Sequence, residues 1–264
     1  MTVIAPKDAS KIEILREFAE YGSITSDMKF EFTFDERENM LDIIEAHNLD
    51  ALVKGKNDVE TAIALMNWLC QNYKHGNPPG WIYEGGKPTP QAIMEAADKW
   101  ESRTNCRGLS LILAQLIRAF GIKAFHITCM PYEEPFDDCH VVVCAYCESI
   151  GKTIILDPTY NLYIRNKSGE TIGVEEFRDI LIAGDEIKFN DDYFSHLCSL
   201  ENYRDYMAKN LIRIRRYEKN NYGADSDDGF VILVPEKYKE NEGKLLGIDE
   251  QAAFVTSRDY FWQI

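Results

Sequence analysis

The clearest hydrophobic pattern lies in the middle of the chain, where helical and strand-like periods follow one another. Apolar residues at three- and four-residue spacing predict helices within 58–75, 91–102 and 104–121. Asn57 or Asp58 would cap the first of these helices and Gly76 would end it. Runs rich in β-branched and aromatic residues then predict strands at 122–130, 139–147 and 152–158. No linker between Asn57 and Pro158 has the composition of a domain boundary, so we expect one α+β domain with extensions at both ends.

The flanking segments are less regular. The expected flanking elements are a strand (28–34), a helix (38–48), a Pro- and Gly-rich loop (77–90), a helix-rich region (173–216) and two further strands (228–235 and 252–264). We therefore expect a central core at 58–165, preceded by an N-terminal extension (1–57) and followed by a C-terminal extension (166–264). The C-terminal extension is expected to pack on the core as helices and strands.

Composition and charge narrow the function classes. The chain has 264 residues, of which 45% are hydrophobic and 28% charged, as expected for a globular protein. Its formal net charge is −15, so nucleic acid and anionic membrane surfaces are not expected partners. No segment is apolar enough for a signal peptide or a membrane span. Seven cysteines, an odd number, fit a reducing cytoplasm better than a disulfide framework.

One of these cysteines lies at the predicted start of the helix 104–121. Thr104 or Asn105 would cap this helix, and Cys106 lies at the edge of its apolar stripe. A helix N-terminus favours the thiolate, which is the nucleophilic form of cysteine, and the Cys106 N–H is free to stabilise an oxyanion. The alternative is a buried cysteine that serves only as a small apolar residue.

The two strands that follow form a hairpin that brings an imidazole to a carboxylate. A turn near Ser149 to Gly151 places the residue opposite His140 between positions 156 and 160, and Asp157 falls in this range. Asp157 would then fix the tautomer of His140. The other four histidines lack such surroundings. Thiol, imidazole and carboxylate together indicate a nucleophilic triad.

The segments NCRGLSLILAQLIRAFGIKA, DCHVVVC and ILDPTYN carry a resemblance to the transglutaminase-like superfamily of papain-like thiol enzymes. The resemblance extends over roughly 58–163. It implies a nucleophile helix packed on an antiparallel sheet, with Cys106 as nucleophile, His140 as general base and then acid, and Asp157 as the residue that orients His140. The superfamily contains peptidases, amidases, transglutaminases and members that have lost activity.

The resemblance therefore implies an acyl-transfer enzyme that acts on a peptide, protein or other amide and needs no cofactor. Hydrolysis of the Cys106 thioester is expected, because it requires no second substrate site. Transamidation or amide formation is the first alternative. A catalytically inactive binding module on the same scaffold is the second, and the presence of all three triad residues argues against it.

The second oxyanion donor is not evident from the motif. His140 is followed by two valines, where the superfamily usually has Ala-Trp. Trp81, in the Pro- and Gly-rich loop, resembles the loop tryptophan of transglutaminases, and its indole N–H could donate. Trp100 is a second candidate. Either tryptophan could instead be a lid or core residue.

Three other clusters suggest different chemistry. The group Cys129, Cys139, His140, Cys144 and Cys147 has ligands that zinc prefers, but its β-branched sequence lacks a knuckle turn, so no metal site is expected. The stretch 225–229, with Glu236, resembles a calcium loop with a misplaced glycine, so a turn is expected. Arg213 and Arg215 share a strand face that could bind a substrate carboxylate, or that simply faces solvent.

Overall fold

The structure of the protein is a computed structural model that describes residues 10–77, 86–132, 138–223, 229–238 and 252–264. The helices are α1 (Lys11–Glu17), α2 (Glu36–Asn39), α3 (Leu41–Ala46), α4 (Leu49–Val53), α5 (Asp58–Asn72), α6 (Pro90–Asp98), α7 (Cys106–Ala119), α8 (Val174–Ala183), α9 (Leu200–Asn210) and α10 (Arg258–Phe261). The strands are β1 (Glu31–Phe32), β2 (Lys74–His75), β3 (Arg103–Thr104), β4 (Ala124–Met130), β5 (His140–Cys147), β6 (Lys152–Asp157), β7 (Leu162–Asn166), β8 (Ile187–Phe189), β9 (Arg213–Tyr217), β10 (Lys219–Asn220), β11 (Phe230–Leu233) and β12 (Ala252–Val255).

One eight-stranded sheet organises this α+β fold, in the order β12-β11-β9-β4-β5-β6-β7-β8. Neighbouring strands are antiparallel except β11 and β12, which are parallel. The predicted strands at 122–130, 139–147 and 152–158 are confirmed as β4, β5 and β6. Because β9 pairs with β4, the C-terminal part of the chain completes the sheet that the central segment begins. The division into a core and two extensions stays a prediction.

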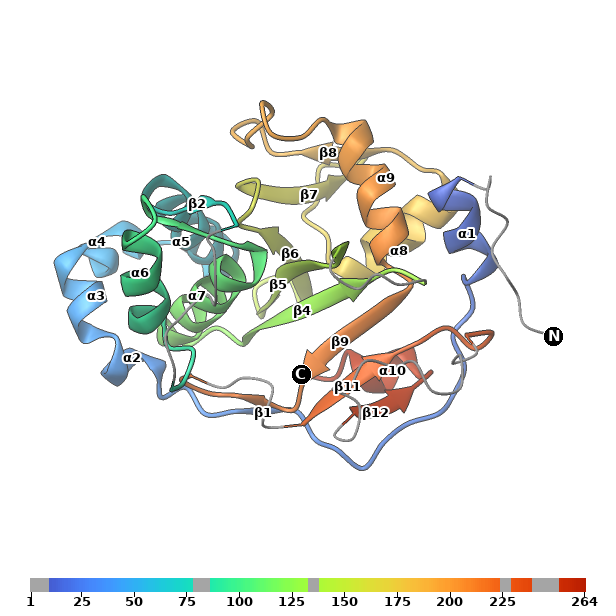
Figure 1. Cartoon of the computed structure of the whole chain (residues 1–264), viewed down its shortest axis with the longest axis horizontal. Helices are drawn as coiled ribbons and strands as arrows, with labels where there is room; N and C mark the ends of the chain where they lie inside the picture. The colour runs from blue at the N-terminus through green and yellow to red at the C-terminus, as the bar shows by residue number, and fades with distance from the viewer. Residues whose placement is uncertain (1–9, 78–85, 133–137, 224–228, 239–251) are drawn as a thin grey trace.

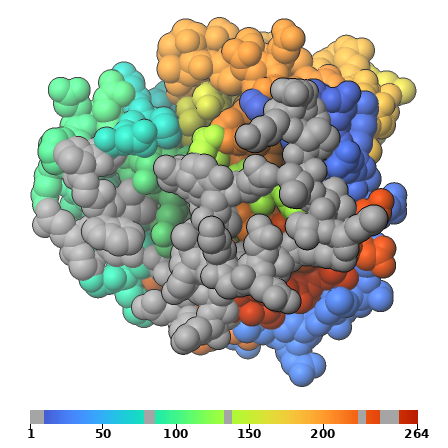
Figure 2. Space-filling view, turned by 45° about the vertical axis from the view of Figure 1, so that its right-hand side comes forward, coloured from blue at the N-terminus to red at the C-terminus, as the bar shows by residue number. Residues whose placement is uncertain are grey.

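Helices cover both faces of the middle of the sheet (Figure 1). Val143 and Ala145 of β5 belong to the apolar cluster that also contains α5, α6 and α7. Val142 and Cys144 point to the opposite cluster, which contains α1, α8 and α9. In the space-filling view α1 (blue) lies against the yellow and orange segments with α8 and α9 (Figure 2). Strands buried on both faces read as continuous apolar runs, which explains the sequence of β4 and β5.

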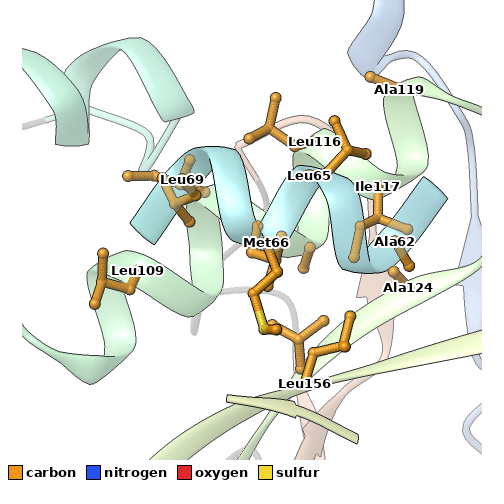
Figure 3. Close-up of a cluster of buried hydrophobic side chains, with 14 of the residues drawn as sticks. Ala62, Leu65, Met66, Leu69, Leu109, Leu116, Ile117, Ala119, Ala124 and Leu156 are labelled. Atoms are coloured by element: carbon orange, nitrogen blue, oxygen red, sulfur yellow. The ribbon is translucent and has the colours of Figure 1, made fainter. Parts of the chain in front are cut away.

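The helix α5 packs across α7, and Met66 of α5 points toward Leu156 of β6 (Figure 3). An Asn57 capping box starts α5: the Asn57 side chain accepts from the Glu60 N–H, and the Glu60 carboxylate accepts from the Asn57 N–H. The predicted end at Gly76 is wrong. The helix ends at Asn72 because the next residues leave it to pair with β3 as strand β2.

The helix α7 is buried on all sides rather than along one stripe. Every residue from Gly108 to Ala119 is buried, including three polar side chains. Gln115 donates to the Pro88 carbonyl at 3.0 Å, and Arg118 forms a buried ion pair with Glu36 of α2. Arg118 also donates to the Ala124 carbonyl at 2.6 Å. These contacts explain how polar residues stay in a central helix, since buried polar groups need partners.

Three predictions for the flanking segments are wrong in part. The strand at 28–34 is reduced to β1, the helix at 38–48 is broken at Met40 into α2 and α3, and 252–264 ends in the helix α10 instead of continuing as strand. Of the loop predicted at 77–90, residues 78–85 lie outside the described part of the chain. Within the part of the chain that the structure describes, no helix has the length and apolar character needed to cross a membrane.

The basic strand face predicted at Arg213 and Arg215 does not face solvent. Arg213 is 1% exposed and donates through Nε to the Pro131 carbonyl at 3.0 Å. Arg215 is half-buried, with its guanidinium over the rings of Tyr217 and Phe230. Both faces of β9 are covered, since all of its side chains are buried except that of Arg215, which is partly buried. Binding of a substrate carboxylate there stays a prediction.

Candidate active site

Cys106 is the first residue of α7, as the sequence predicted. Of the two candidate caps, Asn105 is the one used: its side chain accepts from the Gly108 N–H at 3.0 Å. Thr104 is instead buried against Gly108. A Cβ added to Gly108 would lie only 2.2 Å from the Thr104 hydroxyl oxygen. A glycine is therefore required within the first turn of the helix so that the chain before Cys106 can pack closely. The thiol lies at the end of the helix where negative charge is stabilised.

Two contacts hold this helix end against the start of β5. The buried Ser110 hydroxyl, one turn beyond Cys106, donates to the Val141 carbonyl at 3.0 Å. The backbone N–H of Val141 in turn donates to the Cys106 thiol. The sulfur thereby lies beside the first residues of β5, of which His140 is the first.

His140 and Asp157 meet as the hairpin predicted. The register of β5 and β6 pairs Val143 with Leu156, so Asp157 lies diagonally across from His140 on the same face. His140 Nε2 and Asp157 Oδ2 are 2.7 Å apart, and both side chains are buried. The imidazole also hydrogen-bonds the Cys106 thiol. Since Nε2 is occupied by Asp157, Nδ1 faces the sulfur.

The pKa values of the thiol and the imidazole move in opposite directions. Burial alone would raise the pKa of Cys106, but hydrogen bonds from His140 and His75 and the charge of His140 lower it to about 6. Burial alone would lower the pKa of His140, but the Asp157 carboxylate and the Cys106 thiolate raise it to about 10. Between these two values the pair is a thiolate and an imidazolium.

The remaining six cysteines behave differently. All seven thiols are free, and burial is the main cause that raises the pKa of each of the other six: Cys70, Cys129, Cys139, Cys144, Cys147 and Cys198. Among the seven thiols only that of Cys106 has a lowered pKa, which favours its thiolate, the form that governs cysteine reactivity.

Aromatic residues that the sequence did not identify surround the imidazole and its carboxylate. The Tyr203 hydroxyl of α9 donates to Asp157 Oδ2 at 2.9 Å, and Tyr203 is fully buried. The rings of Tyr160 and Tyr206 lie 6.0 and 5.5 Å from the His140 ring. Tyr203 and Tyr206 are three apart on one helix, which is the only local signal for their shared face.

A second histidine, which the sequence did not identify as part of the site, lies at the nucleophile. His75 of β2 also hydrogen-bonds the Cys106 thiol, so two imidazoles contact the same sulfur. Reasoning from the hairpin could not find this contact, because β2 belongs to a separate two-stranded pairing with β3. The only local feature in the sequence that could have indicated this contact is the position of His75 just after the core helix α5.

The candidate oxyanion donors and metal ligands lie outside the described residues or away from a binding arrangement. Trp81 lies outside the described residues, and Trp100 is 46% exposed in the turn after α6. Residues 225–228 of the calcium-like stretch also lie outside the described part of the chain. Among the residues that the structure describes, no group of His, Cys, Asp and Glu side chains could hold a metal ion.

Comparisons with known proteins give structural similarities only. No protein-family model matches the chain, and no curated protein is similar to it in sequence. Its structure is similar to a provisionally assigned cysteine protease from Cytophaga hutchinsonii (19% identity, TM-score 0.34), over 59% of this chain and 50% of that protein. It is also similar to a red sea bream transglutaminase (14% identity, TM-score 0.37), over 91% of this chain and 46% of that protein. A third similar structure is a transglutaminase (13% identity, TM-score 0.31), matched over 47% of this chain and 31% of that protein. The chain thus spans half or less of each of these proteins, and the chemistry of the site rests on its own geometry.

Proposed function

We propose that the protein is a thiol-dependent acyl-transfer enzyme that hydrolyses an amide or peptide bond through a thioester on Cys106. The observation that carries this proposal is a helix-tip thiol hydrogen-bonded to an imidazole that a buried carboxylate holds from behind. Nucleophile, base and orienting group in this order form the arrangement needed for covalent acyl transfer. A superfamily member without activity would have no need to keep this ion pair.

The proposed reaction uses the thiolate and imidazolium directly. The Cys106 sulfur attacks the carbonyl carbon, and the C=O electron pair moves to the oxygen. When this intermediate collapses, the C–N bond breaks and His140 gives its proton to the leaving amine, which leaves a thioester. His140, now neutral, then accepts a proton from water as water attacks the thioester, and the acid and thiolate are released. Asp157 keeps the imidazole oriented in both steps.

Acylation by p-nitrophenyl acetate tests this proposal without knowledge of the natural substrate. We expect a burst of p-nitrophenolate and one acetyl group on Cys106 by peptide mass spectrometry. Cys106→Ala should remove both signals. Cys198→Ser, at a partly exposed thiol of raised pKa, is the matched control and should behave as the wild type. Equal acetylation of the wild type and Cys106→Ala would contradict the proposal.

The pH dependence of kcat/KM is expected to be bell-shaped. Activity should rise as the thiolate forms near the lowered Cys106 pKa of about 6, and fall as the imidazolium deprotonates near the raised His140 pKa of about 10. The apparent pKa values of the two limbs describe the coupled pair of Cys106 and His140 rather than either residue alone. Alkylation by iodoacetamide needs only the thiolate, so its rate should rise at the acid limb and not fall at the basic limb. A single acid limb near the usual thiol pKa of about 8.5 would contradict this assignment.

Tyr203→Phe is expected to raise the apparent pKa of the basic limb of the kcat/KM profile by about one unit. Burial and the charge of Asp157 raise the pKa of Tyr203 far above its usual range, so its hydroxyl donates to the carboxylate throughout. A hydrogen bond to a charged group is worth about 1.5–3 kcal/mol, and its loss leaves more carboxylate charge to stabilise the imidazolium. Tyr206→Phe is the control, since that hydroxyl contacts the Cys139 carbonyl. An unchanged or lowered limb in Tyr203→Phe would show that Tyr203 only fills space.

A further inference from the structure

His75 is placed beside the nucleophile by a short strand pairing. The parallel register of β2 and β3 sets Lys74 against Arg103 and His75 against Thr104, two residues before Cys106. Backbone hydrogen bonds of 2.9 Å, from Lys74 to Ser102 and from Gly76 to the Thr104 carbonyl, fix this register on both sides of His75. The position of His75 is therefore set by backbone geometry and not by side-chain contacts alone.

The two imidazoles reach the sulfur from different parts of the fold. His140 begins β5 of the main sheet, whereas His75 follows α5 and lies in the separate β2–β3 pair. Both hydrogen-bond the Cys106 thiol. Asp157 holds His140, while the His75 backbone carbonyl accepts from Arg103 at 3.3 Å. In the proposed function His140, which Asp157 orients, transfers the proton to the leaving group. His75 is not needed for that proton transfer, so its contact with the sulfur calls for another explanation.

The tetrahedral intermediate needs donors that face its oxygen. The Cys106 N–H is one, because the first N–H groups of a helix have no partner within the helix. A second donor has to lie near the sulfur, since the oxyanion is bonded to the carbon that the sulfur attacks. It also has to lie apart from His140, which faces the leaving amine. His75 is suited to the first condition, because an N–H at the sulfur is close to an oxygen bonded to the neighbouring carbon. For the second condition, His75 comes from the β2–β3 pair and not from the main sheet that carries His140.

Resting on the proposed function, we propose that His75 is a catalytic residue whose ring N–H, together with the Cys106 backbone N–H, stabilises the oxyanion. As the thiolate forms the S–C bond, the carbonyl electron pair becomes the negative charge on oxygen, and the His75 N–H moves its hydrogen bond from sulfur to oxygen. When the C=O bond re-forms and the C–N bond breaks, His140 supplies the proton to nitrogen. His75 keeps its own proton throughout.

The competing explanation is that His75 only activates the thiol, and two reactions of the same cysteine separate the two roles. Acylation by p-nitrophenyl acetate passes through an oxyanion, whereas alkylation by iodoacetamide displaces iodide and forms none. Each rate is compared at its plateau above the thiol pKa of each variant, so that the thiolate fraction is equal. Alkylation also reports that the pair of Cys106 and His140 remains intact.

In His75→Ala we expect the acylation plateau to fall by about 10²–10³, as for loss of one oxyanion donor, with the alkylation plateau roughly unchanged. His75→Gln should recover much of the acylation rate, because its amide N–H groups can donate. His47→Gln, at an exposed histidine whose ring meets Trp68 edge-to-face, is the control and should match the wild type. An equal loss in both reactions, or no loss in either, would overturn the assignment. A wild-type protein that forms no acetyl-Cys106 would refute the proposed function itself, and the role of His75 with it.

Discussion

Replacing His140 with alanine is expected to lower kcat/KM by about 10²–10⁴. This range is the usual contribution of a positioned general acid and base. The variant loses the proton donor for the leaving amine and the charge that most directly stabilises the thiolate. The pKa of Cys106 should rise from about 6, because burial is then opposed mainly by His75 and the Val141 N–H. Turnover of an amide substrate and the pH dependence of iodoacetamide alkylation measure the two effects separately.

Two controls make this result specific. His47→Ala removes an exposed histidine outside the site and should leave both measurements unchanged. Free imidazole, added to His140→Ala, should restore part of the turnover because the variant leaves space where the ring was. If His140→Ala retained wild-type turnover and an unchanged alkylation profile, the contact between His140 and Cys106 would have no catalytic role.

Replacing Arg118 with alanine is expected to lower the free energy of unfolding by about 3–5 kcal/mol. The change leaves the fully buried Glu36 carboxylate without its cationic partner, and breaking one side of a buried ion pair carries this cost. It also leaves the Ala124 carbonyl without the donor that Arg118 supplies. Burial already raises the pKa of Glu36 in the intact pair. Urea denaturation at several pH values measures the loss.

The pH dependence distinguishes an unpaired charge from simple loss of packing. Without Arg118 the folded-state pKa of Glu36 should rise further above its unfolded value. The loss should therefore grow as the pH rises above about 4.3, the usual glutamate value, and shrink at lower pH, where Glu36 is neutral. Glu36→Gln combined with Arg118→Met removes both charges and should cost less than Arg118→Ala alone. A pH-independent loss would assign the effect to the cavity.

The central part of the fold and the triad could be predicted from local patterns. The strands β4, β5 and β6 are runs of β-branched residues, and one turn fixes how β5 and β6 pair. The residues His140 and Asp157 meet because hairpin register depends only on nearby sequence. The start of α7 at Cys106 follows from a cap that is adjacent to it.

Contacts made by distant segments could not be predicted in the same way. Tyr203 reaches Asp157 from a helix 46 residues further along the chain, and His75 reaches Cys106 through a two-residue strand. The helical period of α7 indicated one apolar face, but α2 supplies Glu36 to cover its polar side. Periodicity reports which residues share a face, and it carries no information on which remote segment covers that face.

Because β9 lies between β4 and β11, it limits how far the chain can be shortened before the main sheet loses an inner strand. A fragment limited to 58–165 would end before β9 and before α9. It would leave one long side of β4 without its neighbour and would strip Asp157 of the Tyr203 hydroxyl. Transferring Cys106, His140 and Asp157 with their present surroundings into a shorter scaffold therefore requires that about the last hundred residues are kept as well.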